Sequence, residues 1–264
     1  MLNITGKNED AYHKMESVFA FLDDVYDELI FYPEIEFNDN SAEIPGVENN
    51  SIKFAAKILK QYFKLKVPHV VVKKNLPISG GVGGGSSDSA CFVNSVFDLW
   101  NFSIDEKLLY MNVFHKLGAD AKVFLYKYFT NSKFLYLNGT GLSGDILPID
   151  LDTKNSYVLI VNNGTKLSTN DVFQNFKGEF SEELGIKKIN FDRLKNFHNS
   201  LQLPAIKIEK SLKDVIADIK STGAIFSGVS GSGSTCFGVY EGKTLAESAK
   251  KSLSKYNLVQ ISKI

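Results

Sequence analysis

The stretch that decides the fold is Pro77-Ile78-Ser79-Gly80-Gly81-Val82-Gly83-Gly84-Gly85-Ser86-Ser87-Asp88-Ser89-Ala90. Five of the six positions from 80 to 85 are glycine, which gives the backbone access to positive φ and leaves no Cβ to obstruct a bound group. Residues 86–88 are good helix N-caps, and apolar residues then recur at helical spacing as far as Trp100. The pattern predicts a glycine loop and a helix whose free N–H groups and positive dipole end can hold phosphate groups.

A flexible linker or a plain strand-to-helix turn is the alternative for any glycine cluster. Helix-capping residues follow this one at once and the strand-like run Val70-Val71-Val72 precedes it, which disfavours a linker. The loop also lacks the G-x-x-x-x-G-K-[ST] and G-x-G-x-x-G patterns, so it is neither a Walker A loop nor a dinucleotide-binding loop.

The stretch resembles the P-x-x-x-G-L-G-G-G-S-S-D-A-A loop of the GHMP kinases, with Val82 in place of leucine and Ser89 in place of alanine. The resemblance implies that the loop binds ATP through its phosphates, with Mg²⁺ near Ser86 or Ser87. The residues that it assigns to the nucleotide are Pro77, Gly80, Gly81, Val82, Gly83, Gly84, Gly85, Ser86, Ser87 and Asp88.

The composition is that of an ordinary globular protein, with 264 residues, 44% hydrophobic and 23% charged. Lys plus Arg and Asp plus Glu both number 30, so no global basic field favours nucleic acid or an anionic membrane. Residues 1–14 lack the apolar core of a signal peptide, and the longest aliphatic run, Val158–Val161, is strand-sized. Cys91 and Cys236 are expected to be reduced thiols. These features favour a cytoplasmic protein with neither nucleic acid nor a membrane as partner. The resemblance implies a small-molecule substrate, and a monomer or weak homodimer is the expected state.

The segment from Thr5 to Phe19 places a Tyr-His pair just before an apolar strand. A lone histidine is usually a surface or hydrogen-bonded core residue. The segment resembles T-G-x-R-x-D-G-Y-H-x-L-x-S-x-F of the 4-diphosphocytidyl-2-C-methyl-erythritol kinases, a branch of the GHMP kinases. The resemblance implies that Tyr12 and His13 lie at the cytidine end of the substrate.

Two further residues enter the nucleotide site only through the resemblance. Asn50 precedes a helical pattern that starts at Ile52, so it could equally be a simple helix cap. Lys74 follows the strand at Val70 and would otherwise be a solvated lysine. The family has matching residues at the nucleotide pocket, beside the adenosine and the adenine base respectively.

The segment from Gly118 to Phe124 carries the candidate catalytic residue. The spacing of apolar residues predicts a helix from Ile104 to Leu117 that ends at Gly118, and an aspartate after such an end is ordinarily a cap or a turn residue. The segment resembles the family's L-G-A-D-V-P-F-F element, in which the aspartate contacts the accepting hydroxyl. The resemblance makes Asp120 the candidate base. Ala121-Lys122 replaces Val-Pro, which loosens the expected turn.

Two segments of the second half resemble substrate-binding elements. Residues 169–173 resemble S-T-x-x-V-F, which implies a role for Thr169 and packing of Phe173 on the cytosine ring; the alternative is a core phenylalanine. Asn163 stands where the family commonly has proline. Residues 230–237 resemble the S-G-S-G-x-x-x-F motif, and the resemblance assigns Gly231, Ser232 and Gly233 to the substrate site.

The elements fit an α+β protein. The glycine-rich residues 138–145 have no helix directly behind them, so they predict a hairpin or loop rather than a second phosphate site. The strands and helices after Tyr157 follow a β-α-β-β-α-β order that is typical of a ferredoxin-like domain. The resemblance implies the GHMP kinase fold: a ribosomal-protein-S5-domain-2-like ATP-binding domain over residues 1–148 and a ferredoxin-like domain over residues 149–264.

The implied activity is ATP-dependent phosphorylation of the 2-hydroxyl of 4-diphosphocytidyl-2-C-methyl-erythritol. Another GHMP kinase, of the homoserine or mevalonate type, and a non-catalytic nucleotide or metabolite binder are the alternatives. The family normally begins with a strand containing A-K-[IL]-N-L, and Lys7 does not match its lysine. We expect the true start to lie upstream of Met1; the alternatives are that another cation replaces this lysine or that turnover is weak.

Overall fold

The computed structural model describes residues 2–9, 12–47, 50–103, 105–106, 113–114, 117–140, 144–153, 155–183, 185, 194 and 198–264. The chain forms two compact units, each assembled from segments that are distant in sequence. The first comprises Met1–Tyr26, Leu76–Val82 and Ser132–Ile264, and the second comprises Asp27–Asn75 and Gly83–Asn131. The glycine stretch is therefore shared between the units, and a domain boundary between residues 148 and 149 stays a prediction.

The first unit contains an antiparallel sheet in the order β1-β2-β5-β6. Its strands are β1 (Leu2–Lys7), β2 (His13–Ala20), β5 (Phe134–Gly139) and β6 (Gly144–Ile149). The pairing of β5 with β6 confirms the hairpin predicted around residues 138–145. The outer edge of β1 is covered as well, because its Leu2 and Ile4 carbonyls accept hydrogen bonds from the Ser200 and Ser181 amides.

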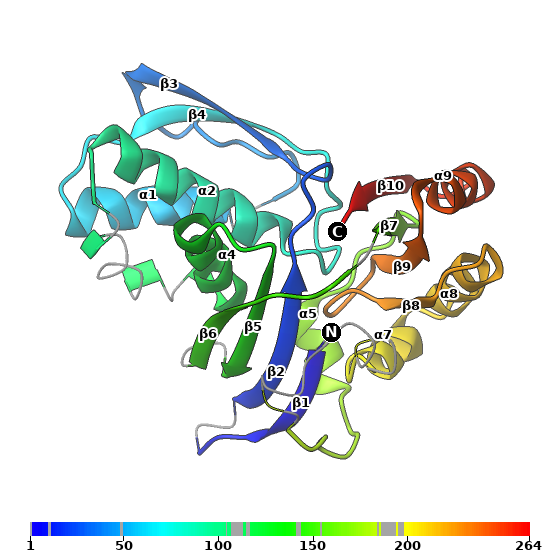
Figure 1. Cartoon of the computed structure of the whole chain (residues 1–264). Coiled ribbons are helices and arrows are strands. Elements are labelled where there is room, and N and C mark those ends of the chain that lie inside the picture. Colours follow the sequence, from blue (N-terminus) through cyan, green and yellow to red (C-terminus); the bar gives the residue numbers. More distant parts are fainter. Residues whose placement is uncertain are drawn as a thin grey trace. The chain divides into compact units, whose positions relative to one another are not determined.

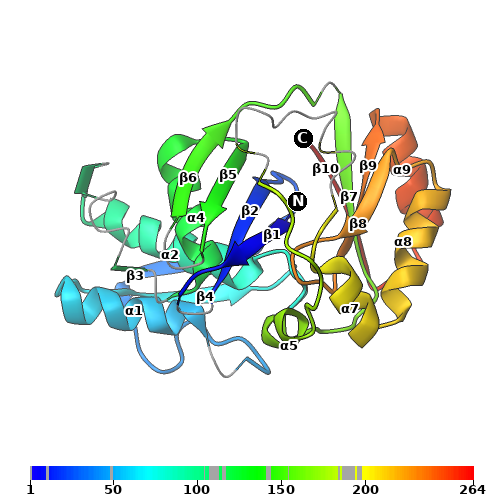
Figure 2. The same ribbon diagram turned by 90° about the horizontal axis from the view of Figure 1, so that it is seen from below.

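The second sheet of this unit has the order β10-β7-β9-β8, all antiparallel, which is the ferredoxin-like arrangement that the order of elements predicts. Helices α8 and α9 cover one face of it (Figure 2). The strands are β7 (Ser156–Asn162), β8 (Phe226–Val229), β9 (Cys236–Glu241) and β10 (Leu258–Lys263), and the helices are α5 (Thr169–Gln174), α7 (Gln202–Ile208), α8 (Ser211–Ser221) and α9 (Lys243–Ser252).

The described part of the second unit packs helices against a two-stranded antiparallel sheet (Figure 1), and its core is rich in aromatic side chains. These elements are α1 (Ser51–Tyr62), α2 (Gly84–Leu99), α4 (Ala119–Thr130), β3 (Glu28–Glu36) and β4 (Pro68–Lys73). The rings of Phe63 and Phe114 stack with centroids 5.9 Å apart, and Phe97 packs edge-on against both. Pro33 lies where the β3–β4 register shifts, as its lack of an N–H predicts.

The start of α2 differs from the prediction that residues 86–88 cap it. The helix begins at Gly84, and its N-cap is Gly83 in a left-handed conformation at φ 70° with no side-chain cap. Ser86, Ser87 and Asp88 lie within the first turns instead. Glycine adopts this φ without strain, so the chain can enter the helix three residues earlier than the capping residues suggest.

The turn expected after Gly118 is wrong, because α4 begins directly after this residue. Gly118 is the N-cap of α4, with φ 113°, and Asp120 lies in the first turn. A carboxylate there is favoured by the positive end of the helix dipole. The helix expected from Ile104 to Leu117 lies largely outside the described residues.

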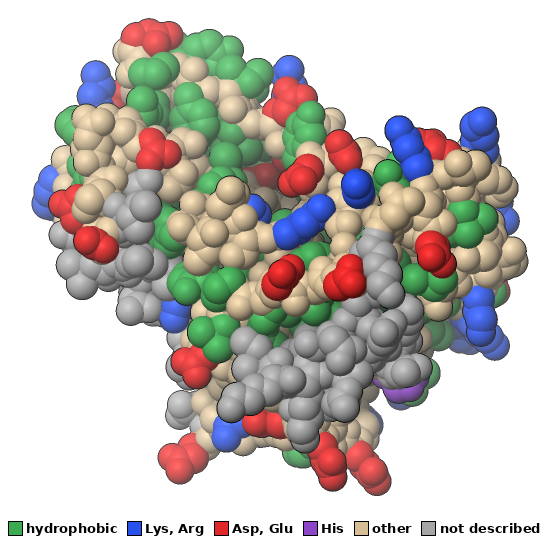
Figure 3. All heavy atoms as spheres, in the orientation of Figure 1, with side chains coloured by type: hydrophobic (Ala, Val, Ile, Leu, Met, Phe, Trp, Pro, Cys, Tyr) green, Lys and Arg blue, Asp and Glu red, His purple; other side chains and the backbone are tan. Residues whose placement is uncertain are grey.

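On the face shown in Figure 3, acidic and basic side chains of the described residues are interspersed, with no broad patch of one sign. No helix in the described part of the chain is both long enough and apolar enough to cross a bilayer.

Candidate active site

The start of α2 offers a row of backbone donors. The first helical hydrogen bond runs from the Ser87 amide to the Gly83 carbonyl, at 2.8 Å. Helix geometry therefore leaves the N–H groups from Gly83 to Ser86 without an acceptor inside the helix, and such N–H groups bind anions. A Cβ on Gly83 would approach the Phe124 ring of α4 to 2.7 Å, so the close packing of α2 on α4 requires glycine at this position.

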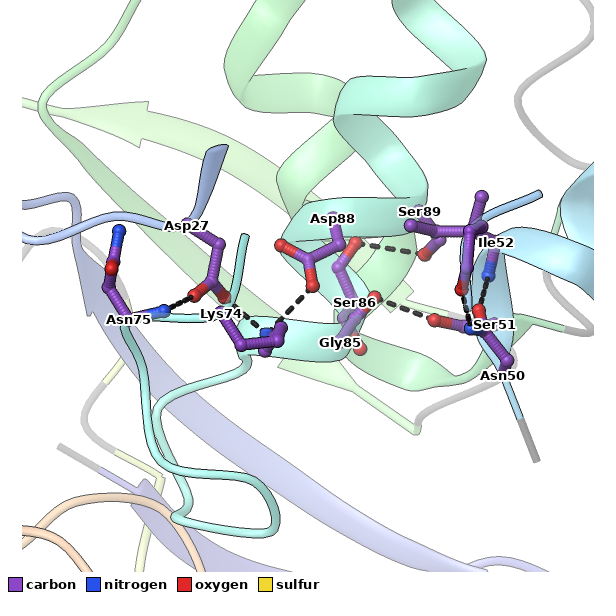
Figure 4. Close-up of polar contacts among 11 residues, drawn as sticks. Asp27, Asn50, Ser51, Ile52, Lys74, Asn75, Gly85, Ser86, Asp88 and Ser89 are labelled. Carbon is purple, nitrogen blue, oxygen red and sulfur yellow. Dashed lines mark hydrogen bonds and ion pairs between the residues drawn. The ribbon is translucent and has the colours of Figure 1, made fainter. Parts of the chain in front are cut away.

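Lys74 is held between two carboxylates beside this helix start (Figure 4). Its ammonium donates to Asp27 and, at 2.8 Å, to Asp88 Oδ2. The side chains of Asp27, Asp88 and Lys74 are 1%, 4% and 15% exposed, so the alternative of a solvated lysine is wrong. Burial raises the pKa of Asp88 to about 6; Lys74 lowers this pKa and Asp27 raises it.

Asn50 is the N-cap of α1, as one of its two interpretations predicts. Its Oδ1 accepts from the amides of Ile52 and Lys53, and its Nδ2 donates to the Ala42 carbonyl at 2.5 Å. The next residue, Ser51, donates from Oγ to the Gly85 carbonyl at 2.8 Å, which joins the starts of α1 and α2 (Figure 4). Asn50 therefore lies close to the helix start, and its contact with the nucleotide stays a prediction.

Asp120 lies in the same unit as the start of α2. It is one helical turn before Phe124, so both side chains point to the same side of α4, and Phe124 packs against Gly83. The residue is half-buried, and burial raises the pKa of its carboxyl group above the ordinary value. A carboxyl group with a raised pKa is a better proton acceptor than an ordinary aspartate.

The earlier glycines of the stretch belong to the first unit and pack against the S-G-S-G loop. Gly80 accepts from the Thr235 amide at 2.9 Å, and Gly81 accepts from Ser230 Oγ at 3.0 Å. A Cβ on Gly81 would come within 2.4–2.6 Å of backbone atoms of Ser230 and Gly233. The close approach of two backbones explains these glycines, and phosphate contacts of Pro77, Gly80 and Gly81 stay a prediction.

His13 and Phe173, predicted from distant segments, lie side by side in the first unit. Their ring centroids are 5.3 Å apart, and Phe176 packs edge-on against His13 at 5.9 Å. Burial, and next the charge of Lys7, lowers the pKa of His13, which favours a neutral imidazole. Tyr12, the residue before His13, is 50% exposed.

Two other predicted substrate residues also meet in this unit. Thr169 and Ser232 share a hydroxyl–hydroxyl hydrogen bond of 3.0 Å. Thr169 is one turn before Phe173 on α5, so the helix presents both to one side. Asn199 Nδ2 fixes the S-G-S-G loop, which contains Ser232, by donating to the carbonyls of Val229 and Gly231, at 2.8 and 2.6 Å.

Sequence reasoning missed Asp27 and Phe176. Phe176 follows Phe173 by three residues, a spacing that puts both on one side of a helical segment and could have indicated it. Asp27 is one of three nearby aspartates, Asp23, Asp24 and Asp27, and nothing local distinguishes the buried one.

No group of three or more His, Cys, Asp or Glu side chains among the described residues is arranged to hold a metal ion. The hydroxyl groups of Ser86 and Ser87, in the first turn of α2, are oxygen ligands of the kind that suits Mg²⁺ bound chiefly through a nucleotide's phosphates.

Comparison with known proteins identifies two matching families. The sequence model described as "GHMP kinases N terminal domain" matches residues 50–127, and "GHMP kinases C terminal" matches residues 185–258. A protein named 4-diphosphocytidyl-2-C-methyl-D-erythritol kinase from Chloroherpeton thalassium is 30% identical, over 96% of this chain and 90% of its own. A protein of the same name from Clostridium tetani is 30% identical, over 99% of this chain and 95% of its own.

The fold matches that of a solved 4-(cytidine 5'-diphospho)-2C-methyl-D-erythritol kinase. The TM-score is 0.79 at 24% identity, over 99% of this chain and 94% of the other. A mevalonate kinase from L. major has the same fold with a TM-score of 0.60 at 14% identity, over 94% of this chain and 89% of the other.

Proposed function

The chain belongs to the 4-diphosphocytidyl-2-C-methyl-D-erythritol kinase family of the GHMP kinases. We therefore propose that it transfers the γ-phosphoryl group of ATP to the substrate after which that family is named. The acceptor is the 2-hydroxyl group of 4-diphosphocytidyl-2-C-methyl-D-erythritol, and the reaction is a step of the non-mevalonate isoprenoid pathway. The observation that carries the proposal is the pairing, in one compact unit, of an anion-binding helix start with the half-buried Asp120.

The start of α2 supplies the phosphate site. The N–H groups from Gly83 to Ser86 bind phosphate oxygens, and the positive end of the helix dipole stabilises their charge. The hydroxyl groups of Ser86 and Ser87 would hold Mg²⁺, which offsets phosphate charge when it is bound. Asn50 and Lys74 lie beside the adenosine part of the nucleotide.

Asp120 handles the proton of the reaction. The 2-hydroxyl oxygen forms a bond to the γ-phosphorus while the bond from that phosphorus to the bridging oxygen of ADP breaks, and the hydroxyl proton passes to the Asp120 carboxylate. The raised pKa of this carboxyl group supports that role, because it strengthens the carboxylate as a base. Most of the remaining rate enhancement comes from positioning and from the phosphate donors.

The first unit binds the cytidine end of the substrate. Phe173 and His13 form an aromatic pair against which a cytosine ring packs, and Tyr12 contributes its exposed ring. A neutral imidazole at His13 can donate one hydrogen bond and accept another, which suits the edge of cytosine. Thr169, Gly231, Ser232 and Gly233 bind the polar part of the substrate.

We assign residues 1–148 to the ATP-binding domain and 149–264 to the C-terminal domain, and the two family matches fall on either side of that boundary. The proposed cytoplasmic location is supported by the two free cysteines, Cys91 and Cys236. A monomer or weak homodimer is proposed as the solution state, and sedimentation velocity over a range of concentrations measures it.

Acceptor selectivity tests this function. ADP release is measured with 4-diphosphocytidyl-2-C-methyl-D-erythritol, homoserine and mevalonate at equal concentrations. Release that requires the cytidine-linked acceptor is expected. Release with homoserine or mevalonate instead would assign the chain to another GHMP activity, and binding of both ATP and the cytidine-linked acceptor without release would mark a non-catalytic binder.

A further inference from the structure

Asp27 belongs to none of the elements that sequence similarity assigns to the site, yet it is the most deeply buried charge beside the start of α2. Its side chain is 1% exposed. The residue directly precedes β3 and Lys74 directly follows β4, so the two lie just beyond the Glu28–Lys73 pair that ends this two-stranded antiparallel sheet.

Both carboxylate oxygens of Asp27 have defined partners. Oδ2 accepts a hydrogen bond from the Lys74 ammonium, and Oδ1 accepts from the Asn75 backbone amide at 2.6 Å. One side chain therefore fixes the head group of Lys74 and also the main chain that follows it (Figure 4). A lysine side chain otherwise has four freely rotating bonds, and its ordering in one position costs conformational entropy.

The second anchor of Lys74 lies on the helix that is proposed to bind phosphate. Asp88 Oδ2 accepts from the same ammonium at 2.8 Å, from the second turn of α2. Two of the three ammonium N–H groups thus point to carboxylates, and the third remains for another acceptor. The ammonium is held at a fixed distance from the helix start rather than reaching into solvent.

On the basis of the proposed function, we propose that Asp27 is a positioning residue of the nucleotide site. Its carboxylate holds the Lys74 ammonium against the early turns of α2 and so sets where that ammonium meets the base of the bound nucleotide. Asp27 acts through Lys74 and does not itself touch ATP.

A purely electrostatic role and a positioning role for Asp27 predict opposite changes in ATP affinity when its charge is removed. ATP is polyanionic, so removal of a nearby negative charge strengthens its binding if charge alone matters. If Asp27 positions Lys74, the same removal weakens binding because the ammonium keeps only its Asp88 anchor and is no longer fixed from both sides. It also reduces the preference for ATP over GTP, because the group that contacts the base is no longer fixed.

The test is a double-mutant cycle on ATP binding, measured by calorimetry without any acceptor. The variants are Asp27→Asn, Lys74→Met and the double variant, with Glu28→Gln as the matched control because Glu28 forms an exposed ion pair with Lys73 on the adjacent rung. We expect about tenfold weaker ATP binding for Asp27→Asn, the range of a hydrogen bond to a charged group. The double variant should bind no more weakly than Lys74→Met, and Glu28→Gln should stay within about twofold of the wild type.

Equal or tighter ATP binding by Asp27→Asn, or effects of the two single variants that multiply in the double variant, would overturn the proposal. Circular dichroism checks that each variant is folded. If Asp27→Asn is unfolded, Asp27→Glu, which keeps the charge but moves it, is judged by the same criteria. Titration needs no turnover, so a wild-type chain that binds ATP, fails to phosphorylate the acceptor and still shows the coupling would refute the proposed function alone. A wild-type chain that binds no ATP would refute both.

Discussion

At the scale of single residues, the Asp120 carboxyl group is the proposed base of the reaction. Burial raises its pKa, so the group ionises at a higher pH than an ordinary aspartate. The ionised form is the proposed proton acceptor. kcat/KM should therefore rise with pH through the raised pKa and then level off.

Replacement of Asp120 with asparagine keeps the size of the side chain and removes the proton acceptor. We expect kcat to fall by about 10²–10⁴-fold, with ATP binding nearly unchanged and with the acidic limb of the pH profile lost. Steady-state kinetics from pH 5.5 to 8.5 measure kcat and the pH profile, and an ATP titration measures binding. Asp145→Asn, on the exposed side of β6, is the control. A variant with wild-type turnover would mean that Asp120 has no part in the chemistry.

Asp88 gives a second prediction, for stability. Its pKa is raised from 3.8 to about 6 in the folded protein, so between these values the folded state binds the proton more readily than the unfolded state. The free energy of unfolding contributed by this group is thus highest at low pH and is lost as pH rises through about 6. Asp88→Asn lacks this titration.

The Tm of the wild type relative to Asp88→Asn should therefore fall from pH 4.5 to pH 7 and then stay constant. Thermal melts of both proteins at intervals of half a pH unit measure this difference in Tm. Glu28→Gln, which removes an exposed carboxylate of the neighbouring ion pair, should show no such trend relative to the wild type. A constant difference between the wild type and Asp88→Asn across this range would show that Asp88 does not titrate there.

At the scale of elements, the packing of α2 on α4 depends on Gly83. Gly83→Ala combines two costs, the left-handed φ of 70° and a Cβ 2.7 Å from the Phe124 ring. Gly46→Ala is a matched control, because Gly46 has a φ of 74° but no atom within 4 Å of a Cβ. The φ cost is about 1–2 kcal/mol, and overpacking adds about 1–3 kcal/mol.

Urea denaturation should therefore find Gly83→Ala less stable than Gly46→Ala by about 1–3 kcal/mol. Since the start of α2 must shift to relieve the contact, ATP should also bind Gly83→Ala more weakly. Equal stability of the two variants would mean that Phe124 moves freely and that α2 does not need its close contact with α4.

The local elements were largely predictable from sequence. The aliphatic runs at Val70 and Val158, and the polar Asn50 ahead of an apolar helical stripe, are local patterns that the structure confirms as β4, β7 and the capped α1. The helix that starts after Gly118 was not predicted, because glycine is common after a helix and also serves as an N-cap, and the sequence offers no local sign that distinguishes the two. The helix α7 was missed because it is only seven residues long and contains Pro204.

The contacts that build the site were not predictable from sequence. The need for glycine at Gly81 arises from the backbone at Ser230 and Gly233, about 150 residues away, and the burial of Asp27 arises from Lys74 and Asn75. Such contacts depend on tertiary packing rather than on local propensity. The resemblance nevertheless indicated His13 with Phe173 and Thr169 with Ser232, and each pair is in contact.

At the scale of the whole molecule, distant segments complete each compact unit. Strand β2 pairs with β5, more than a hundred residues later, and Ile4 of β1 packs into the core that Leu159 and Leu212 form. Long-range pairings of this kind give a high contact order, which is typical of slow-folding mixed domains. The start of α2 and Asp120 belong to the second unit, and the residues proposed to recognise cytidine belong to the first.

The identity of the reaction product tests the central claim most directly. The chain is incubated with ATP, Mg²⁺ and 4-diphosphocytidyl-2-C-methyl-D-erythritol, and the mixture is followed by phosphorus-31 NMR and mass spectrometry. We predict ADP and, in equal amount, a new phosphomonoester on the 2-hydroxyl group with the diphosphate bridge intact. Unchanged acceptor in the presence of bound ATP, or a phosphate on any other hydroxyl group, would contradict the account.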